Sequence, residues 1–191
     1  MSLDQSLVNV QAYIKKERIK VKNVILKNIS DKADKFDPFE NENCFYIYNI
    51  EIEKTVISQL IYLLKPNQNK EQKTTFFNNS NIIDFPILKN IKEQILNILK
   101  KHSLQLGNNW AQLYNKNNYH PIHVHTGSKY SGIIYIDGKN ASPTTFYSKS
   151  FKEYNHLFKQ NTLILFPSWI PHQVKKLKKD EERLIISFNA N

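Results

Sequence analysis

The chain has 191 residues, of which 40% are hydrophobic, and a formal net charge of +10. A chain of this length is expected to fold as one domain and to bury a sizeable core without disulfides. Its single cysteine, Cys44, excludes an internal disulfide and a zinc site made of several cysteines. Histidine, with six copies, is therefore the nitrogen or sulfur ligand most available to a metal.

No stretch of the sequence has the apolar length of a signal peptide or of a membrane span. Together with the low cysteine content, this predicts a cytoplasmic protein without a membrane partner. The positive charge is compatible with a nucleic-acid partner. The lysines, however, are scattered among asparagines and isoleucines as a compositional bias would scatter them, so this partner is the less favoured interpretation. The oligomeric state is left open.

Residues 1–43 are polar and mixed, and we expect them to form an N-terminal extension outside a main domain of residues 44–191. The first segment of that domain, 44–50, is aromatic and β-branched, which predicts a strand. Two helices are predicted next, over 53–64 and 87–101, because apolar residues recur there at spacings of three and four. The polar stretch between the helices is expected to be a loop.

From residue 108 onward the pattern changes to short apolar runs separated by turn residues. Several short strands at this spacing favour a β-sandwich or barrel, so two helices precede a C-terminal β domain. The predicted strands cover residues 110–114, 122–125, 131–137, 144–147, 162–166, 172–174 and 184–188.

Two histidines in the predicted strand 122–125 form the first candidate site. His123 and His125 are two residues apart and would share one face of that strand, whereas His120 is off this register and precedes it. Two imidazoles do not close a metal site alone, and His172 supplies a third. Imidazole suits zinc, copper, iron and nickel alike. The alternative is a polar seam in which each histidine hydrogen-bonds a neighbour.

The second candidate is Arg183, which would share a strand face with Ile185 and Ser187. If this face points into a barrel, the buried guanidinium needs an anionic partner, and its planar fork suits a carboxylate. With no acid on its own strand, Arg183 indicates a ligand carboxylate. The alternative is an exposed arginine that pairs with Glu181 or Glu182.

Four aromatic residues complete the candidates. The phenol of Tyr114 or Tyr135 could hydrogen-bond a carboxylate inside the barrel, or each ring could simply pack in the core. Trp110 and Trp169 could line a substrate mouth near the metal, and each could equally belong to the core.

Residues 110–189 resemble the 2-oxoglutarate- and Fe(II)-dependent oxygenases, most closely the prolyl-hydroxylase-like branch. The strings 131–136 and 166–172 are similar to a subfamily of bacteria and their phages in which His-x-His replaces His-x-Asp. The family's pieces occur here in order as Tyr114, His123-Val124-His125, the tyrosine-bearing strand 131–137, the apolar strand 162–166, His172 and Arg183.

The resemblance implies a mainly β, α+β fold, namely a double-stranded β-helix or jelly roll with helices packed on its larger sheet. It implies that His123 and His172 bind Fe(II), and that 2-oxoglutarate chelates the iron while its distal carboxylate pairs with Arg183. Tyr135 would help to bind that carboxylate, and Tyr114 would border the same pocket. With O2, 2-oxoglutarate would be decarboxylated to succinate, with hydroxylation of the substrate as the default outcome.

The sequence departs from the family at His125, where a carboxylate is usual, and at Ile185, where a serine often occurs. Three interpretations of His125 stay open: a working three-histidine iron site, a site for another divalent metal, or a degenerate binding protein. Two further functions compete. One is a cupin-like metalloprotein that does not use 2-oxoglutarate. The other is a non-catalytic jelly-roll module that contacts nucleic acid through the lysines of 175–179, expected as the exposed turn of a hairpin.

The substrate is also left open by the sequence. A small molecule or a peptidyl side chain would each be compatible with the predicted site, and so would a nucleobase.

Overall fold

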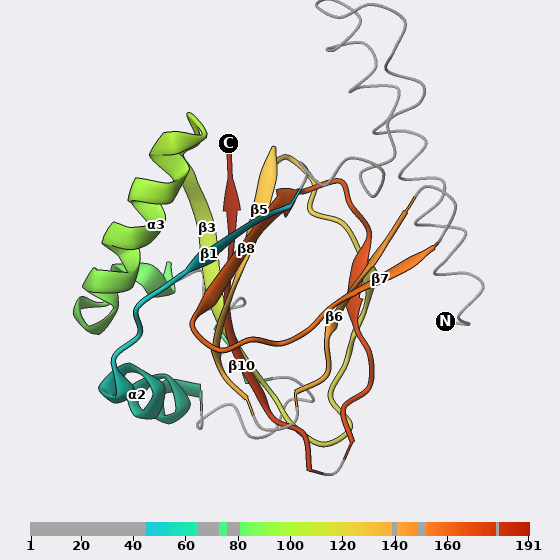
Figure 1. Ribbon diagram of the computed structural model, residues 1–191. Coiled ribbons are helices and arrows are strands. Elements are labelled where there is room, and N and C mark those ends of the chain that lie inside the picture. Colours follow the sequence, from blue (N-terminus) through green and yellow to red (C-terminus); the bar gives the residue numbers. More distant parts are fainter. Residues whose placement is uncertain (1–44, 65–72, 76–80, 139–140, 149–151, 179) are drawn as a thin grey trace, which may run out of the picture.

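The computed structural model describes residues 45–64, 73–75, 81–138, 141–148, 152–178 and 180–191. Its strands form two antiparallel sheets that face each other (Figure 1). The larger sheet contains β1 (Tyr46–Asn49), β2 (Lys73–Thr74), β3 (Leu106–Tyr114), β5 (Tyr130–Asp137), β8 (Thr162–Pro167) and β10 (Arg183–Ala190). The smaller contains β4 (His120–His123), β6 (Thr144–Tyr147), β7 (Glu153–His156) and β9 (His172–Val174).

The order of the strands is that of a double-stranded β-helix. In the larger sheet it runs β1-β8-β5-β10-β3-β2, and in the smaller sheet β4-β9-β6-β7. From β3 to β10 the chain passes from one sheet to the other at each step except between β6 and β7, and it winds around a space that both sheets enclose. The predicted fold class is confirmed.

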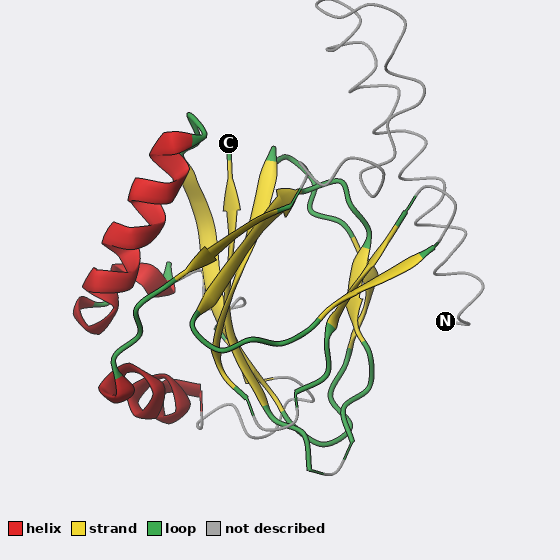
Figure 2. Cartoon of the chain, viewed as in Figure 1, coloured by secondary structure: helices red, strands yellow, loops and turns green. Residues whose placement is uncertain are grey.

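Both predicted helices form, as α2 (Lys54–Leu64) and α3 (Lys89–Lys101), and they lie on one side of the larger sheet (Figure 2). Two 3-10 turns, η5 (Ile82–Asp84) and η6 (Pro86–Leu88), lead into α3. The helices form there because their apolar residues recur on one face, which is then buried against the sheet. In α3 the buried positions are Ile91, Ile95, Ile98 and Leu99.

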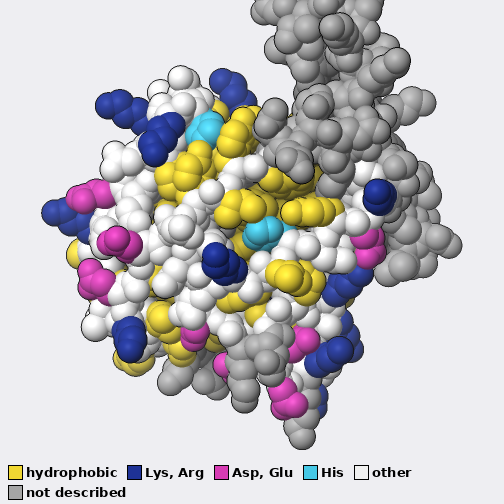
Figure 3. Space-filling model, in the orientation of Figure 1, with side chains coloured by type: hydrophobic (Ala, Val, Ile, Leu, Met, Phe, Trp, Pro, Cys, Tyr) yellow, Lys and Arg dark blue, Asp and Glu magenta, His cyan; other side chains and the backbone are white. Residues whose placement is uncertain are grey.

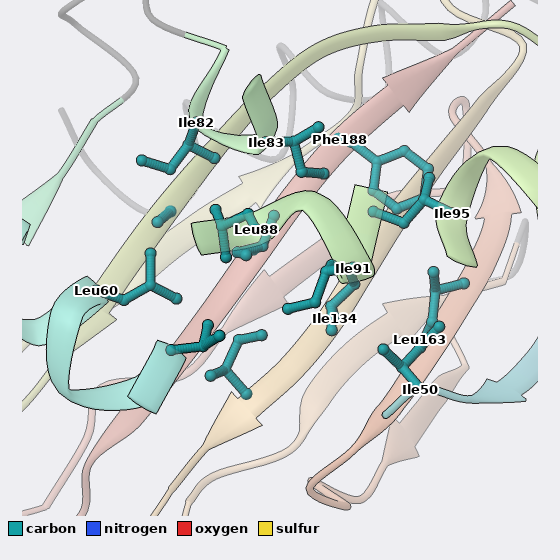
Figure 4. Packing of buried hydrophobic residues seen from close by; sticks show 14 of the residues in the cluster. Ile50, Leu60, Ile82, Ile83, Leu88, Ile91, Ile95, Ile134, Leu163 and Phe188 are labelled. Atoms are coloured by element: carbon teal, nitrogen blue, oxygen red, sulfur yellow. The ribbon is translucent and has the colours of Figure 1, made fainter. Parts of the chain in front are cut away.

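The main hydrophobic core lies between these helices and the larger sheet (Figure 4). Ile134, Leu163 and Phe188 contribute to it from three neighbouring strands of the sheet. Since side chains alternate along a strand, the other face of β10 presents Arg183, Ile185 and Ser187 to the space between the sheets. The predicted shared face of these three residues is confirmed.

The strand that carries the histidines differs from the prediction. A strand was expected over 122–125, but β4 begins at His120 and ends at His123. Pairing with β9 sets His120 opposite Val174 and His123 opposite His172, so three steps along β4 match two along β9. This bulge adds one residue and brings His120 and His123 to the same side. His120 is thus part of the strand, and His125 lies beyond it.

The expected hairpin between His172 and Arg183 is also wrong. β9 and β10 belong to different sheets, so the segment between them crosses from one sheet to the other. β7 was not predicted, and β2 lies within the stretch expected to be a loop. The proposed N-terminal extension, 1–43, lies outside the described residues. No helix in the described part of the chain is long and apolar enough to cross a membrane.

Candidate active site

Three histidines converge between the two sheets. Nitrogen atoms of His123, His125 and His172 all lie within 4.8 Å of one another. His123 and His172 are direct partners across β4 and β9, which places both rings on one face. His125 reaches the same point from beyond β4, where its backbone N–H donates to the carbonyl of Ser168 at 3.0 Å. The structure brings together the three residues that the sequence grouped, but His125 lies beyond β4 and does not share a strand face with His123 as expected.

Backbone carbonyls orient two of the three rings. Nδ1 of His123 lies 2.9 Å from the carbonyl of Pro121, and Nδ1 of His172 lies 3.0 Å from that of Ile170. A carbonyl only accepts, so each Nδ1 must carry the hydrogen. Each Nε2 therefore keeps its lone pair, which is the state that binds a metal.

The third ring fits the same centre. Nε2 of His125 is 3.3 Å from Nε2 of His172. Two nitrogens bound about 2.1 Å from one ion would lie about 3.0–3.4 Å apart, so this spacing suits a shared metal. Two lone pairs facing each other at this distance would repel, so the pair requires either a proton or a cation between them.

Burial keeps these imidazoles neutral. It lowers the pKa of His125 to about 3, with a smaller contribution from His123, and it lowers the pKa values of His123 and His172 as well. Neutral imidazole is the metal-binding form. No aspartate or glutamate is among the described residues that line the cavity around them, so its donor set is imidazole without carboxylate.

Arg183 lines the same cavity and is fully buried. Nη1 donates to the carbonyl of Ser142 at 2.8 Å, and Nη2 donates to Oγ1 of Thr144 at 2.6 Å, while Nε has no partner. Within the described segments, no carboxylate lies at ion-pair distance from this guanidinium. The alternative of an exposed arginine is excluded, and Glu181 instead accepts from the Ser142 hydroxyl at 2.7 Å. A buried cation with an unused donor favours an anionic ligand, because none of the described residues supplies the opposite charge.

Tyr135 lies against this arginine. Its ring centroid is 5.2 Å from the guanidinium carbon of Arg183, and its hydroxyl lies 2.7 Å from Oγ1 of Thr144. Tyr135 is fully buried and does not line the cavity, whereas Thr144 does. Sequence reasoning missed Thr144. A threonine in a short strand carries no distinctive signal, and its partners come from two other strands.

The inner face of β3 completes the opposite wall. Tyr114 pairs with Arg183, and Trp110 pairs with Ser187, so both predicted residues face the cavity. Between them Gln112, which the sequence did not single out, also lines it. Gln112 and Ser187 are only 6% and 7% exposed, and neither side chain has a hydrogen bond within the described structure. Buried polar groups usually have partners, so these two groups are available to a ligand.

His120, set aside on sequence grounds, also belongs to the cavity. Its ring stacks on that of His123 with centroids 4.0 Å apart, and its Nδ1 lies 3.2 Å from the hydroxyl of Tyr114. Burial lowers its pKa to about 3, so it too is neutral. The bulge in β4 explains why spacing alone placed His120 on the wrong side.

The predicted residue Trp169 and two further histidines lie elsewhere. Trp169 packs against the inner hydrophobic cluster and does not line the cavity. His102 ends α3, where its Nε2 lies 2.6 Å from the hydroxyl of Tyr48. His156 stacks on Tyr135, with ring centroids 5.6 Å apart.

The lysine run does not form a continuous basic surface in the described residues. Lys175 pairs with Glu153 at 2.8 Å, and Leu177 within the run is buried. On the face drawn in Figure 3, lysine and arginine side chains are spread among acidic and neutral ones. These features give no support to a nucleic-acid interface at this place.

Comparison with known proteins identifies the same class as the resemblance. A family model described as "Putative 2OG-Fe(II) oxygenase" matches residues 140–189, which include His172 and Arg183 but not His123 or His125. No curated protein matches the sequence. The His-x-His subfamily therefore stays a prediction.

Solved structures show the same fold. The viral collagen prolyl hydroxylase of Paramecium bursaria Chlorella virus-1, in complex with 2OG, is 11% identical, with a TM-score of 0.58 over 77% of this chain and 94% of that one. A Trichoplax adhaerens prolyl hydroxylase in complex with a hypoxia-inducible-factor peptide is 14% identical, with a TM-score of 0.56 over 80% and 86%. A Pseudomonas putida prolyl-4-hydroxylase is 13% identical, with a TM-score of 0.52 over 76% and 86%. At these identities the likeness concerns the fold. The predicted resemblance and the double-stranded β-helix are confirmed.

Proposed function

We propose that this chain, a 2-oxoglutarate- and Fe(II)-dependent oxygenase by family match and fold, binds Fe(II) through His123, His125 and His172 and oxidatively decarboxylates 2-oxoglutarate to succinate. One observation carries the proposal beyond the match. Arg183 is a fully buried cation in the same cavity as the three imidazoles, and it has no anionic partner among the described residues. A dicarboxylate that chelates the metal at one end would supply that partner at the other.

The residues present fit this pair of ligands. Two imidazoles have their Nδ1 hydrogens bound to carbonyls, which leaves Nε2 free to hold iron. When bound, iron would supply the activation of O2. The role of Arg183 is to fix the distal carboxylate and thereby the orientation of the co-substrate.

His125 makes the site one unit more positive than a site with a carboxylate at this position. The extra positive charge should favour an anionic chelating co-substrate. Of the three interpretations of His125, we favour the working three-histidine iron site, because its Nε2 already lies at a ligand's distance from that of His172. Another divalent metal and a degenerate site are the alternatives that metal analysis would distinguish.

Hydroxylation of a small-molecule or peptidyl substrate is the proposed outcome. The polar group of that substrate would find Gln112 and Ser187, whose side chains have no partner in the described structure, with the Trp110 ring beside them. The neighbours named as prolyl hydroxylases make a peptidyl substrate reasonable, and nothing in the cavity requires one. A cytoplasmic location stays a prediction.

The test is succinate release from 2-oxoglutarate by the iron-loaded protein in air, with and without candidate substrates. We expect slow uncoupled turnover by the wild type and none by His172→Ala or in the presence of a chelator. An anaerobic titration of the iron-loaded protein with 2-oxoglutarate gives an independent reading of co-substrate binding. Bound metal with neither turnover nor 2-oxoglutarate binding would support the cupin-like alternative and refute the proposal.

A further inference from the structure

His125 is held differently from the other two histidines of the candidate metal centre. His123 and His172 each have Nδ1 beside a backbone carbonyl, whereas Nδ1 of His125 has no hydrogen bond within the described structure. His125 also lies beyond the end of β4, so the pairing of β4 with β9 does not fix its backbone. Its position therefore depends on its backbone hydrogen bond to Ser168 and on the packing of its ring beside Trp110, with centroids 5.7 Å apart.

Ser168 is the residue that fixes the backbone of His125. Its carbonyl accepts the N–H of His125 at 3.0 Å, and its own N–H donates to the carbonyl of Lys129 at 3.0 Å. Ser168 itself lies one residue beyond β8, which ends at Pro167. It is fully buried, so a hydrogen bond that it lost would not be replaced by one to solvent.

The side chain of Ser168 ties this residue to the larger sheet. Its Oγ lies 2.8 Å from Oγ of Ser131 in β5, and Oγ of Ser131 lies 3.2 Å from Oδ1 of Asn189 in β10. An amide oxygen only accepts, so Ser131 donates its one hydrogen to Asn189. The hydrogen between the two serines must then come from Ser168. The hydroxyl groups thus form a directed chain from Ser168 through Ser131 to Asn189.

This chain of hydrogen bonds is almost closed to solvent. Ser131 is 2% exposed and Ser168 is fully buried, so neither hydroxyl is there for solubility. Two buried hydroxyls that were replaced by apolar groups of the same shape would cost the fold little. The one contact of Ser168 that leads to the candidate metal centre is its carbonyl, which holds His125.

We propose that Ser131 and Ser168 are positioning residues of the metal centre. The hydrogen bond between their hydroxyls holds the carbonyl of Ser168 where it fixes the backbone of His125, and thereby places the imidazole of His125 at the metal. Neither serine is itself a ligand. This inference rests on the proposed function, because it concerns how one ligand of that centre is held.

The experiment measures Co(II) binding by calorimetry and by visible absorption, so that no turnover is needed. We expect Ser168→Ala and Ser131→Ala each to raise the Kd for Co(II) about three- to tenfold, which is less than the loss of a direct partner of a ligand. Both should shift the Co(II) spectrum toward that of His125→Ala. The double variant should match the more affected single variant, since each substitution removes the same hydrogen bond.

A second comparison removes His125 itself. If the serines act through His125, the variant that combines Ser168→Ala with His125→Ala should bind Co(II) within about twofold of His125→Ala alone. A general loss of packing would instead weaken Co(II) binding by the same factor in both backgrounds. The melting temperature of each variant is measured alongside.

Ser148 provides the matched control. It is a serine of similar burial, at 3% exposed, and its Oγ accepts from the backbone N–H of Lys152 at 2.9 Å. It does not line the cavity. Ser148→Ala therefore removes a buried serine hydroxyl by the same substitution and should leave the Kd for Co(II) unchanged.

Three results would overturn the inference. The first is that Ser131→Ala and Ser168→Ala both bind Co(II) within about twofold of the wild type. The second is that Ser168→Ala has the same effect with and without His125. If Ser168→Ala does not fold, Ser131→Ala decides the matter in the same two tests, because it removes the same hydrogen bond. The third is a wild type that binds no Co(II), in which case the proposed metal centre fails and this inference fails with it.

Discussion

His123 and His172 are direct cross-strand partners, and each has its Nδ1 within 3.0 Å of the carbonyl of the residue two positions before it in the chain. The two rings are therefore oriented by local backbone, before any metal binds. A site whose ligands are already fixed loses little conformational freedom on binding.

Removing the most buried ligand should abolish metal binding. His172 is 4% exposed, and His172→Ala leaves two imidazoles, which do not close a site. We expect an affinity for Co(II) or Fe(II) at least about 100-fold weaker than that of the wild type, measured by calorimetry and by metal content after dialysis. His102→Ala is the control, because this histidine bonds to Tyr48 far from the site. A fully loaded His172→Ala protein would show that the metal is held elsewhere.

His125 is the ligand that departs from the usual set of two histidines and one carboxylate. If it binds the metal, His125→Ala should lose at least about tenfold in affinity, whereas His125→Asp should retain metal because a carboxylate oxygen replaces the nitrogen. The visible absorption of bound Co(II) reports the change in donor set directly. Identical Co(II) spectra for the wild type and all three variants, including His172→Ala, would contradict a site built from these histidines.

Arg183 should control co-substrate binding and not metal binding. Arg183→Lys keeps a positive charge but loses the planar fork, so we expect at least about tenfold weaker 2-oxoglutarate binding. Arg183→Met removes the charge and should lose about 100-fold or more. Both should bind Mn(II) within about threefold of the wild type. Unchanged 2-oxoglutarate binding by either variant, shown by calorimetry, would assign the carboxylate to another residue.

The metal-free protein should lose stability in mild acid. Burial lowers the pKa values of His120 and His125 to about 3, whereas an unfolded histidine titrates near 6.5. Below about pH 6.5 the unfolded chain therefore takes up protons that the folded chain does not, and the free energy of unfolding falls as the pH drops toward 3. Urea unfolding in the presence of a chelator at pH 7.5, 6 and 5 measures this slope.

Replacing one of these rings provides the comparison. His125→Gln removes a group that titrates in the unfolded chain, so its stability should depend less on pH over the same range. A wild-type stability that stays constant between pH 7.5 and 5 would show that these histidines are not held neutral by the fold.

Gly132 should resist any larger residue. A Cβ at this position would overlap the ring of Phe188 in the main core, whereas a Cβ at Gly107 would lie 3.2 Å from the carbonyl oxygen of Asn189. We expect Gly132→Ala to destabilise by about 1–3 kcal/mol, and Gly107→Ala to cost less. Combining Gly132→Ala with Phe188→Leu should recover part of the loss, because it frees space. Thermal unfolding measures all three, and equal melting temperatures would contradict the packing.

Patterns within single segments were enough to predict much of the fold. The three- and four-residue spacing of apolar residues placed α2 and α3, since a helix buries one face. The alternation of side chains along a strand predicted that Arg183 and Ser187 share the inner face of β10, because successive side chains point to opposite sides. The same local rule failed in β4, where a bulge adds one residue and moves His120 to the side of His123.

The candidate site, like the fold, was only partly predictable from the sequence. The residue types of the site, three histidines and one arginine in a strand, could be singled out from the sequence. Imidazole and guanidinium groups are seldom buried without a ligand or a partner. The contacts that make them a site depend on strands far apart in the chain. Ser168 holds His125, and Thr144 holds Arg183 beside Tyr135. These contacts depend on how the two sheets pack against each other. A serine or threonine becomes part of the site only when folding brings a buried donor within hydrogen-bonding distance of it.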